Sequence, residues 1–282
     1  MTRVFRWVWA VVGIALLGMN LAGLFLPLRS PEIGHLPLNR YGNTLTLSRQ
    51  EVERRLRPDG RSHARYAADV TRTVHQALTY YWGSQDPRDD DRYRLRIPLH
   101  ENYLLFLANV VRPDIFRRYE IADYRKALER GVGTCSQSAV IATMILRERG
   151  IEARTVLLLR HTVTTARVGE AGEWWVIDPT CGAIVKRPID AILADPEIIR
   201  GPYREAGQSD EAINTIIAAF RSSRSAGKSV IAVPERLALE RGCDVAKWAL
   251  PATMLLATGV LGRRRGPRVP SSPAGEDRCE PE

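Results

Sequence analysis

Residues 131–182 read GVGTCSQSAVIATMILRERGIEARTVLLLRHTVTTARVGEAGEWWVIDPTCG, and they carry the clearest structural pattern in the chain. Within them, residues 139–146 are apolar or small on every side, which predicts a helix packed around its whole circumference. This helix is expected to begin at Thr134 or Cys135, after a tight glycine turn, and to end at Gly150. Three runs typical of β-strands follow, at 151–160, 161–168 and 173–178.

Cys135 lies at the expected N-terminus of this helix. Unpaired backbone N–H groups and the positive end of the helix dipole stabilise a thiolate at such a position. The alternative is that Cys135 is a small buried apolar residue, as most free cysteines are. The polar residues of the strands that follow bear on this choice.

His161 and Asp178 lie on successive strands that are joined by a turn at Gly169 and Gly172. If these two glycines pair, Asp178 is the diagonal neighbour of His161 on the same face of the sheet. A slip of the pairing by two residues makes them directly opposite, whereas a slip by one places them on opposite faces. In the first two registers, Cys135 would be the nucleophile, His161 would hold the thiolate as an ion pair and later protonate the leaving group, and Asp178 would fix the imidazole tautomer.

These motifs resemble the bacterial transglutaminase-like branch of the papain-like cysteine fold. The resemblance rests on GVGTCSQ, GIEARTVLLLRH, HTVTTARV and WWVIDPTCG, and it extends more loosely over residues 100–182. In that superfamily the cysteine opens a helix that packs on an antiparallel sheet, the histidine begins the second strand, and the aspartate ends the third in a W-x-x-x-D-P pattern. These positions match Cys135, His161 and Asp178. The resemblance implies an α+β fold and thiol acyl-transfer chemistry through an acyl-enzyme. We expect no cofactor and no metal, because the histidines and cysteines show no paired ligand spacing and no calcium site is visible.

The resemblance leaves the reaction open, because the superfamily contains crosslinking acyltransferases, peptidases, amidases and non-catalytic binding modules. We therefore expect a hydrolase or acyltransferase that acts on an amide or peptide carbonyl of a protein or peptide substrate. The alternative is a non-catalytic scaffold module in an envelope complex. Some membrane-attached relatives resemble companions of cell-surface polysaccharide assembly, which makes cell-envelope polysaccharide machinery an expected partner.

The donors that would stabilise an oxyanion are less clearly marked. The backbone N–H of Cys135 is the first candidate, because amides at a helix start point outward. No glutamine lies a few residues before Cys135, where a papain-type side-chain donor would be expected. Gln137, Asn102 and Tyr103 are the side-chain candidates, and Gln137 has the alternative role of a helix-start residue that bonds locally.

Two apolar segments predict a membrane protein that is bound to a lipid bilayer. Residues 7–26 contain no charge and would span about 30 Å as a helix, so we expect an uncleaved transmembrane helix over residues 7–28. A cleaved signal peptide is the alternative, but the segment after it lacks a small-x-small cleavage site. Residues 245–262 are expected to form a second span, which contains Pro251; the alternative is a buried C-terminal helix.

The charged flanks of these two segments predict the orientation. Arg3 and Arg6 precede the first segment and four arginines follow the second: Arg263, Arg264, Arg265 and Arg268. The positive-inside rule then places residues 1–6 and a disordered tail, 263–282, in the cytoplasm. Residues 29–244 would form an extracytoplasmic domain on the periplasmic or outer face of the inner (cytoplasmic) membrane.

The formal net charge of +9 does not indicate a nucleic-acid partner, because the 41 basic residues are spread along the chain.

Four helices are expected in the first half of the domain, at 48–56, 64–82, 102–111 and 121–130. The segment 102–111, NYLLFLANVV, is apolar all round and is therefore expected to be buried.

Overall fold

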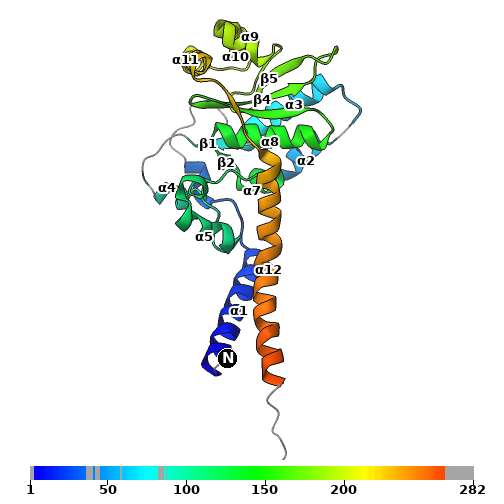
Figure 1. Cartoon of the computed structure of the whole chain (residues 1–282). Coiled ribbons are helices and arrows are strands. Elements are labelled where there is room, and N and C mark those ends of the chain that lie inside the picture. Colours follow the sequence, from blue (N-terminus) through cyan, green and yellow to red (C-terminus); the bar gives the residue numbers. More distant parts are fainter. Residues whose placement is uncertain are drawn as a thin grey trace, which may run out of the picture.

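The computed structural model describes residues 3–35, 41, 45–57, 59–81, 86 and 88–263. It consists of a mixed α and β domain at one end and two long helices that extend from it, as Figure 1 shows. The expected tail, 263–282, lies outside the described residues except for Arg263. The predicted α+β class is confirmed by helices packed on an antiparallel sheet.

The central sheet has five antiparallel strands in the order β6-β5-β4-β3-β7. Their bounds are β3 Ala153–Leu158, β4 His161–Arg167, β5 Trp174–Asp178, β6 Ala183–Val185 and β7 Ser229–Val230. The pairs Thr164↔Ile177 and Thr165↔Val176 fix the register of β4 and β5. This is the register that pairing of Gly169 with Gly172 predicts, and it places Asp178 diagonally from His161 on one face.

The central helix α8 (Cys135–Glu148) packs on strands β3 and β4. Its residues Val140, Ile141 and Ala142 are fully buried, as the sequence pattern predicted. A short parallel pair, β1 (Thr79–Tyr80) and β2 (Val132–Gly133), holds the segment that leads into α8. Gly133 is required there because a Cβ atom would lie 2.5 Å from the Cβ of Gln137. The pairing of β2 with β1 and the close contact between Gly133 and Gln137 together fix where α8 begins.

Helices cover both faces of the sheet (Figure 1). On the face of α8 lie α2 (Arg49–Arg55), α3 (His63–Ala77) and α7 (Tyr124–Arg130), which share one apolar core. The other face is covered by α9 (Ile189–Ala194), η2 (Pro196–Ile199), α10 (Arg200–Glu205) and α11 (Asp210–Ala226), which form a second core. Helix α3 ends at Ala77, earlier than the predicted residue 82, because Thr79 and Tyr80 pair with β2 instead.

The predicted burial of the segment 102–111 is wrong. It forms the helix α5 (Tyr103–Val111), in which Tyr103 and Leu105 are buried, whereas Val110 and Val111 are 74% and 77% exposed. The apolar composition of a segment predicts a helix, but it does not determine which side of that helix packs against the rest of the protein.

Three short elements complete this end of the domain: η1 (Pro31–His35), α4 (Arg88–Arg92) and α6 (Pro113–Phe116).

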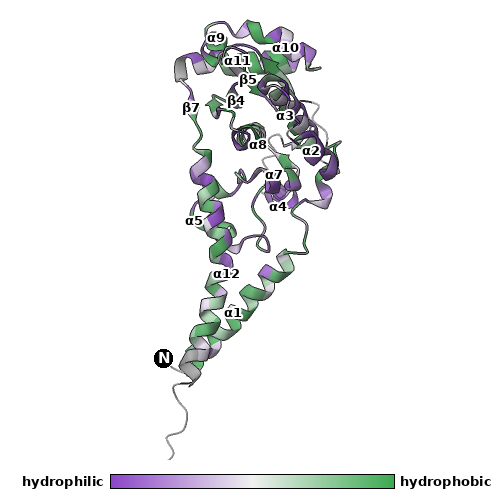
Figure 2. Ribbon diagram, turned by 90° about the vertical axis from the view of Figure 1, so that its right-hand side faces the viewer, coloured by the Kyte–Doolittle hydropathy of each residue, from purple (hydrophilic) through white to green (hydrophobic). Residues whose placement is uncertain are grey.

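The two long helices are α1 (Arg3–Gly23) and α12 (Val233–Arg263). The first part of α12 packs against the domain, and its remainder lies beside α1 outside the domain (Figures 1 and 2). They approach closely, since a Cβ atom on Gly13 would lie 3.1 Å from Leu255 Cγ. Among the described residues, one helix is long and apolar enough to cross a membrane, Val4–Gly23, with a mean hydropathy of 1.7. The predicted second span is not identified as one; its residues belong to α12, which runs unbroken through Pro251.

Pro251 lacks the N–H group that would bond to the carbonyl of Lys247 four residues earlier. Two side chains replace that missing donor. Asn20 Nδ2, from the single amide of the apolar segment in α1, donates to Lys247 O at 2.6 Å, and the Tyr103 hydroxyl donates to the same oxygen at 3.1 Å. The proline is therefore accommodated by contacts with α1 and α5.

Candidate active site

Cys135 is the first residue of α8, and its side chain is partly exposed. The N-cap residue, Thr134, makes no capping hydrogen bond with its side chain. The N–H groups of the first turn are therefore not capped by that hydroxyl. Uncapped N–H groups at a helix N-terminus can donate to an oxyanion.

Asp178 is fully buried at the end of β5, and both of its carboxylate oxygens are satisfied. Oδ2 accepts a hydrogen bond from His161 Nε2 at 2.7 Å and another from the Tyr203 hydroxyl at 2.7 Å. Oδ1 accepts from the backbone N–H groups of Thr180, at 3.0 Å, and Cys181, at 3.2 Å. Burial raises the pKa of this carboxyl, but the charge and hydrogen bond of His161 and the other donors outweigh it and lower the pKa.

His161 is buried at the start of β4, and its Nε2 atom is committed to Asp178. The other ring nitrogen, Nδ1, is therefore the one available to the Cys135 sulfur, which interacts with this imidazole. Burial would lower the pKa of His161, but Asp178, followed by Cys135, raises it to about 10. The structure thus brings the three predicted residues Cys135, His161 and Asp178 together, and the buried carboxylate favours the protonated form of the imidazole.

The raised pKa of His161 predicts a pH-dependent contribution to folding stability. Because the folded state holds this proton more tightly than the unfolded state, the stabilisation is complete below the ordinary value of 6.5 and is lost as the pH rises towards about 10. We expect the difference in Tm between the native chain and His161→Gln to shrink steadily between these two pH values. Thermal unfolding of both proteins in one detergent, followed by circular dichroism, measures it. A constant difference over that range would contradict the raised pKa.

Gln137 is not placed to stabilise an oxyanion. Its side chain is fully buried, Oε1 accepts hydrogen bonds from Ile121 N at 2.7 Å and Arg130 Nη2 at 2.6 Å, and Nε2 donates to Ile121 O at 2.9 Å. Burial lowers the pKa of Arg130 to about 10, and its guanidinium also donates to three backbone carbonyls, those of Leu95, Tyr119 and Val132. Gln137 and Arg130 therefore hold the loops around the start of α8.

Asn102 and Tyr103 are also committed elsewhere. Asn102 caps α5, where Oδ1 accepts from the N–H groups of Leu104 and Leu105, and its Nδ2 donates to Asp244 on α12. The Tyr103 hydroxyl bonds to the carbonyl of Lys247, as described above. All three side-chain candidates for the oxyanion site therefore bond to other groups, and the backbone N–H of Cys135 stays a prediction.

Two tyrosines near the site were missed by sequence reasoning. Tyr203, on α10, donates to Asp178, and burial raises its pKa well above the ordinary value. Tyr80, on β1, is buried, and burial followed by the neighbouring Cys135 raises its pKa. Neither lies in a motif, and both reach the site through long-range packing. The hydrogen bonds of Asp178 Oδ1 were predictable from the neighbouring residues, because Asp-Pro-Thr-Cys is typical of an Asx turn.

One of three comparisons with known proteins found a match, and this match covers the segment that contains the candidate site. Residues 102–179 match the family model described as "Transglutaminase-like superfamily". Searches of curated proteins and of solved structures each returned no match. The matched segment begins at the N-cap of α5 and includes α8, β3, β4 and β5, and with them Cys135, His161 and Asp178. Residues 102–179 of this chain are therefore identified as transglutaminase-like, as the sequence motifs predicted.

Proposed function

We propose that this protein is a membrane-anchored thiol enzyme that forms a thioester between Cys135 and the carbonyl carbon of an amide or peptide substrate. The observation that carries the proposal is the bond between His161 Nε2 and the buried Asp178 carboxylate, which leaves Nδ1 for the sulfur at the start of α8. A histidine that merely stabilised the core would not need a buried carboxylate with four hydrogen bonds behind it. The match to the transglutaminase-like superfamily supports a cysteine-based enzyme.

The proposed acyl transfer uses these groups in turn. The Cys135 thiolate attacks the carbonyl carbon, a C–S bond forms, and the backbone N–H of Cys135 donates to the oxyanion. As the C–N bond breaks, protonated His161 gives its proton to the leaving amine. Water or a second amine then attacks the thioester, His161 accepts a proton from it, and the C–S bond breaks. Water makes the enzyme a hydrolase, and an amine makes it a crosslinking acyltransferase.

Trapping the acyl-enzyme tests this proposal. The full chain in detergent is mixed with p-nitrophenyl acetate, a small acyl donor, and the product is analysed by intact mass and peptide mapping. One acetyl group is expected on Cys135, with a burst of nitrophenol, and none is expected in Cys135→Ala. Cys243→Ala is the matched control, because Cys243 lies on α12 and burial raises its pKa. Equal acetylation of the native chain and Cys135→Ala would overturn the proposal.

The second part of the proposal is the anchor: α1 and the half of α12 beyond Val245 cross the bilayer together. Apolar side chains along α1 are exposed, such as Trp7 at 66% and Val11 at 61%, and those of α12 include Leu256 at 68%. Figure 2 shows the apolar character of α1. Asn20 bonds across the pair to Lys247 O, as polar groups do between membrane helices. The orientation rests on the positive-inside rule, with the domain on the periplasmic or outer face.

The exposed face of α5 fits the same arrangement. A Cβ atom on Gly23, at the end of α1, would collide with the backbone carbonyl of His100, so α1 ends against the segment that leads into α5. We propose that Val110 and Val111 meet the lipid surface. An association with cell-envelope polysaccharide assembly stays a prediction from the resemblance.

A fluorescence measurement tests the anchor. An environment-sensitive dye on Val110→Cys is expected to emit at shorter wavelength in lipid vesicles than the same dye on Ser222→Cys. Ser222 is exposed on α11, a helix that lies at the opposite end of the molecule from α1 (Figure 1). The other accessible cysteines are replaced by alanine in both proteins. Equal emission from the two positions would show that α5 does not face lipid, and release of the chain by carbonate without detergent would contradict the spans.

A further inference from the structure

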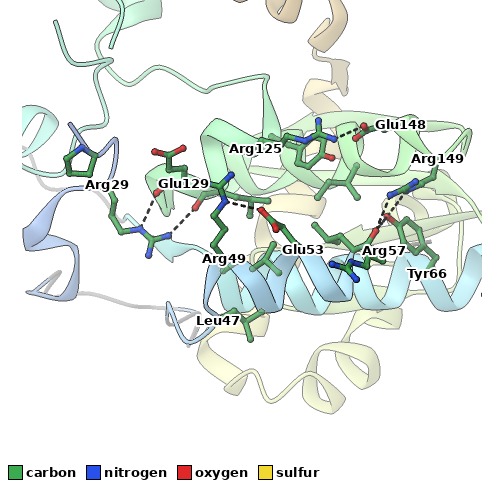
Figure 3. Close-up of a pocket in the computed structure, with 17 residues that line it drawn as sticks. Arg29, Leu47, Arg49, Glu53, Arg57, Tyr66, Arg125, Glu129, Glu148 and Arg149 are labelled. Atoms are coloured by element: carbon green, nitrogen blue, oxygen red, sulfur yellow. Dashed lines mark hydrogen bonds and ion pairs between the residues drawn. The ribbon is translucent and has the colours of Figure 1, made fainter. Parts of the chain in front are cut away.

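A pocket of about 510 Å³ lies on the side of the domain formed by α2, α3, α7 and the end of α8 (Figure 3). Its volume falls within the range of about 300–1,000 Å³ that is usual for small-molecule sites. Six aliphatic side chains line it: Leu47, Val52, Leu56, Ala77, Leu128 and Ile145. Pro27 and Arg29, from the segment that follows α1, close one end.

This pocket is separate from the candidate active site. Ile145 and Arg149 line it at the C-terminal end of α8, whereas Cys135 begins the same helix. At 1.5 Å per residue, the length of α8 separates the two places by about 20 Å. A molecule in the pocket is therefore not the substrate whose carbonyl reaches the sulfur.

The charged residues around the pocket are unequal in number, with five arginines and three glutamates. Two of the arginines are neutralised, because Arg125 pairs with Glu148 and Arg49 pairs with Glu53. The other three, Arg29, Arg57 and Arg149, have no carboxylate within ion-pair distance among the described residues. Figure 3 shows Arg57 and Arg149 at one end of the pocket and Arg29 at the other.

Arg29 and Arg149 each use only some of their N–H groups in hydrogen bonds within the protein. Arg149 donates to Leu56 O at 3.3 Å and to the Tyr66 hydroxyl at 3.4 Å, and Arg29 donates to two backbone carbonyls at the end of α7. A guanidinium carries five N–H donors, so each keeps several for another acceptor. Burial lowers the pKa of Arg29, with Glu129 acting in the opposite direction, which reflects a cation held partly away from water.

We propose that this pocket binds an amphiphile with a single hydrocarbon chain and an anionic carboxylate or phosphate head. The hydrocarbon chain packs against the aliphatic lining, and the head accepts hydrogen bonds from Arg57 and Arg149, whose planar groups match either oxyanion. The volume suits one chain. Pro27 and Arg29 lie within six residues of the end of α1, so this end of the pocket is the one nearest to the proposed membrane span. The pocket does not depend on the proposed chemistry at Cys135.

Photocrosslinking of the full chain tests the site. The chain is placed in nanodiscs of phosphatidylcholine and incubated with three diazirine-labelled C16 probes: a fatty acid, an alkyl phosphate and the neutral alcohol. The acid or the phosphate is expected to label peptides from residues 47–56 and 124–149, about tenfold more than the alcohol does, because charged hydrogen bonds are lost with the neutral head. The stronger of the two anionic probes identifies the head group.

Substitutions at the head-group end make the test specific. Arg57→Gln combined with Arg149→Gln is expected to reduce labelling by the anionic probe about tenfold and to leave labelling by the alcohol unchanged. Arg57→Glu serves as a second variant, because the exposed Arg57 side chain holds no other described group in place. Arg54→Gln, which pairs with Glu51 outside the pocket, is the matched control. Equal labelling by acid, phosphate and alcohol, or labelling confined to α1 and α12, would overturn the proposal.

Discussion

Cys135→Ala is expected to reduce the rate of acyl transfer by a factor of about 10⁴ or more, since removal of a nucleophile leaves only substrate binding and the oxyanion donors. The backbone N–H of residue 135 remains in this variant, as does the bond between His161 and Asp178. The loss is therefore expected in turnover rather than in folding. Steady-state release of nitrophenol from p-nitrophenyl acetate, with Tm measured on the same samples, separates the two.

Two comparisons decide how this result is interpreted. Cys243→Ala removes a thiol on α12 and is expected to retain the native rate. A cell that carries only Cys135→Ala is expected to behave like a deletion strain in any phenotype of the protein. If it behaves like the wild type instead, the non-catalytic scaffold alternative is correct, even though the thiol can be acylated in the test tube.

Asp178→Asn is expected to be nearly as damaging, with a loss of about 10⁴-fold in the same rate. The amide oxygen keeps the bonds to Thr180 N and Cys181 N, so the amide NH₂ group faces His161 Nε2. That nitrogen must then become an acceptor, which moves the ring proton to Nδ1, next to the sulfur. A neutral ring in this tautomer cannot accept a proton from the thiol. The rate of thioester formation, measured by stopped flow against pH, reports this loss.

Comparison with Tyr203→Phe separates the effect of the imidazole tautomer from general disruption of the site. It removes one hydrogen bond to Asp178 Oδ2 but leaves the carboxylate and its bond to His161. We expect a loss of about tenfold, in keeping with one hydrogen bond to a charged group. If Tyr203→Phe were as inactive as Asp178→Asn, general disruption of the site, and not the tautomer, would explain both.

The local parts of the site could be predicted from the sequence. The short turn at Gly169 and Gly172 restricts the register to a few alternatives, and the structure has one of the two that place His161 and Asp178 on one face. The start of α8 is likewise marked by residues next to Cys135, such as Gly133. In each case the determining residues lie within one hairpin or one helix turn.

The parts that depend on distant contacts could not be predicted. Gln137 follows the nucleophile and has the right chemistry for an oxyanion donor, but Arg130 and Ile121 take up its side chain. Tyr203 reaches Asp178 from a segment without a motif. The exposed side of α5 depends on what surrounds the helix, and no periodicity in 102–111 encodes that.

The unbroken course of α12 has a further consequence for any enzyme built this way. The helix begins three residues after β7, and two of its acidic residues, Glu240 and Asp244, bind the start of α7 and Lys126. The twelve residues from 233 to 244 rise about 18 Å before the proposed span begins. In the proposed membrane arrangement, a helix packed on the domain in this way would hold the sulfur at a constant height above the bilayer, so that only carbonyl groups presented at that height would be in range. A flexible tether would instead let the sulfur sample many heights.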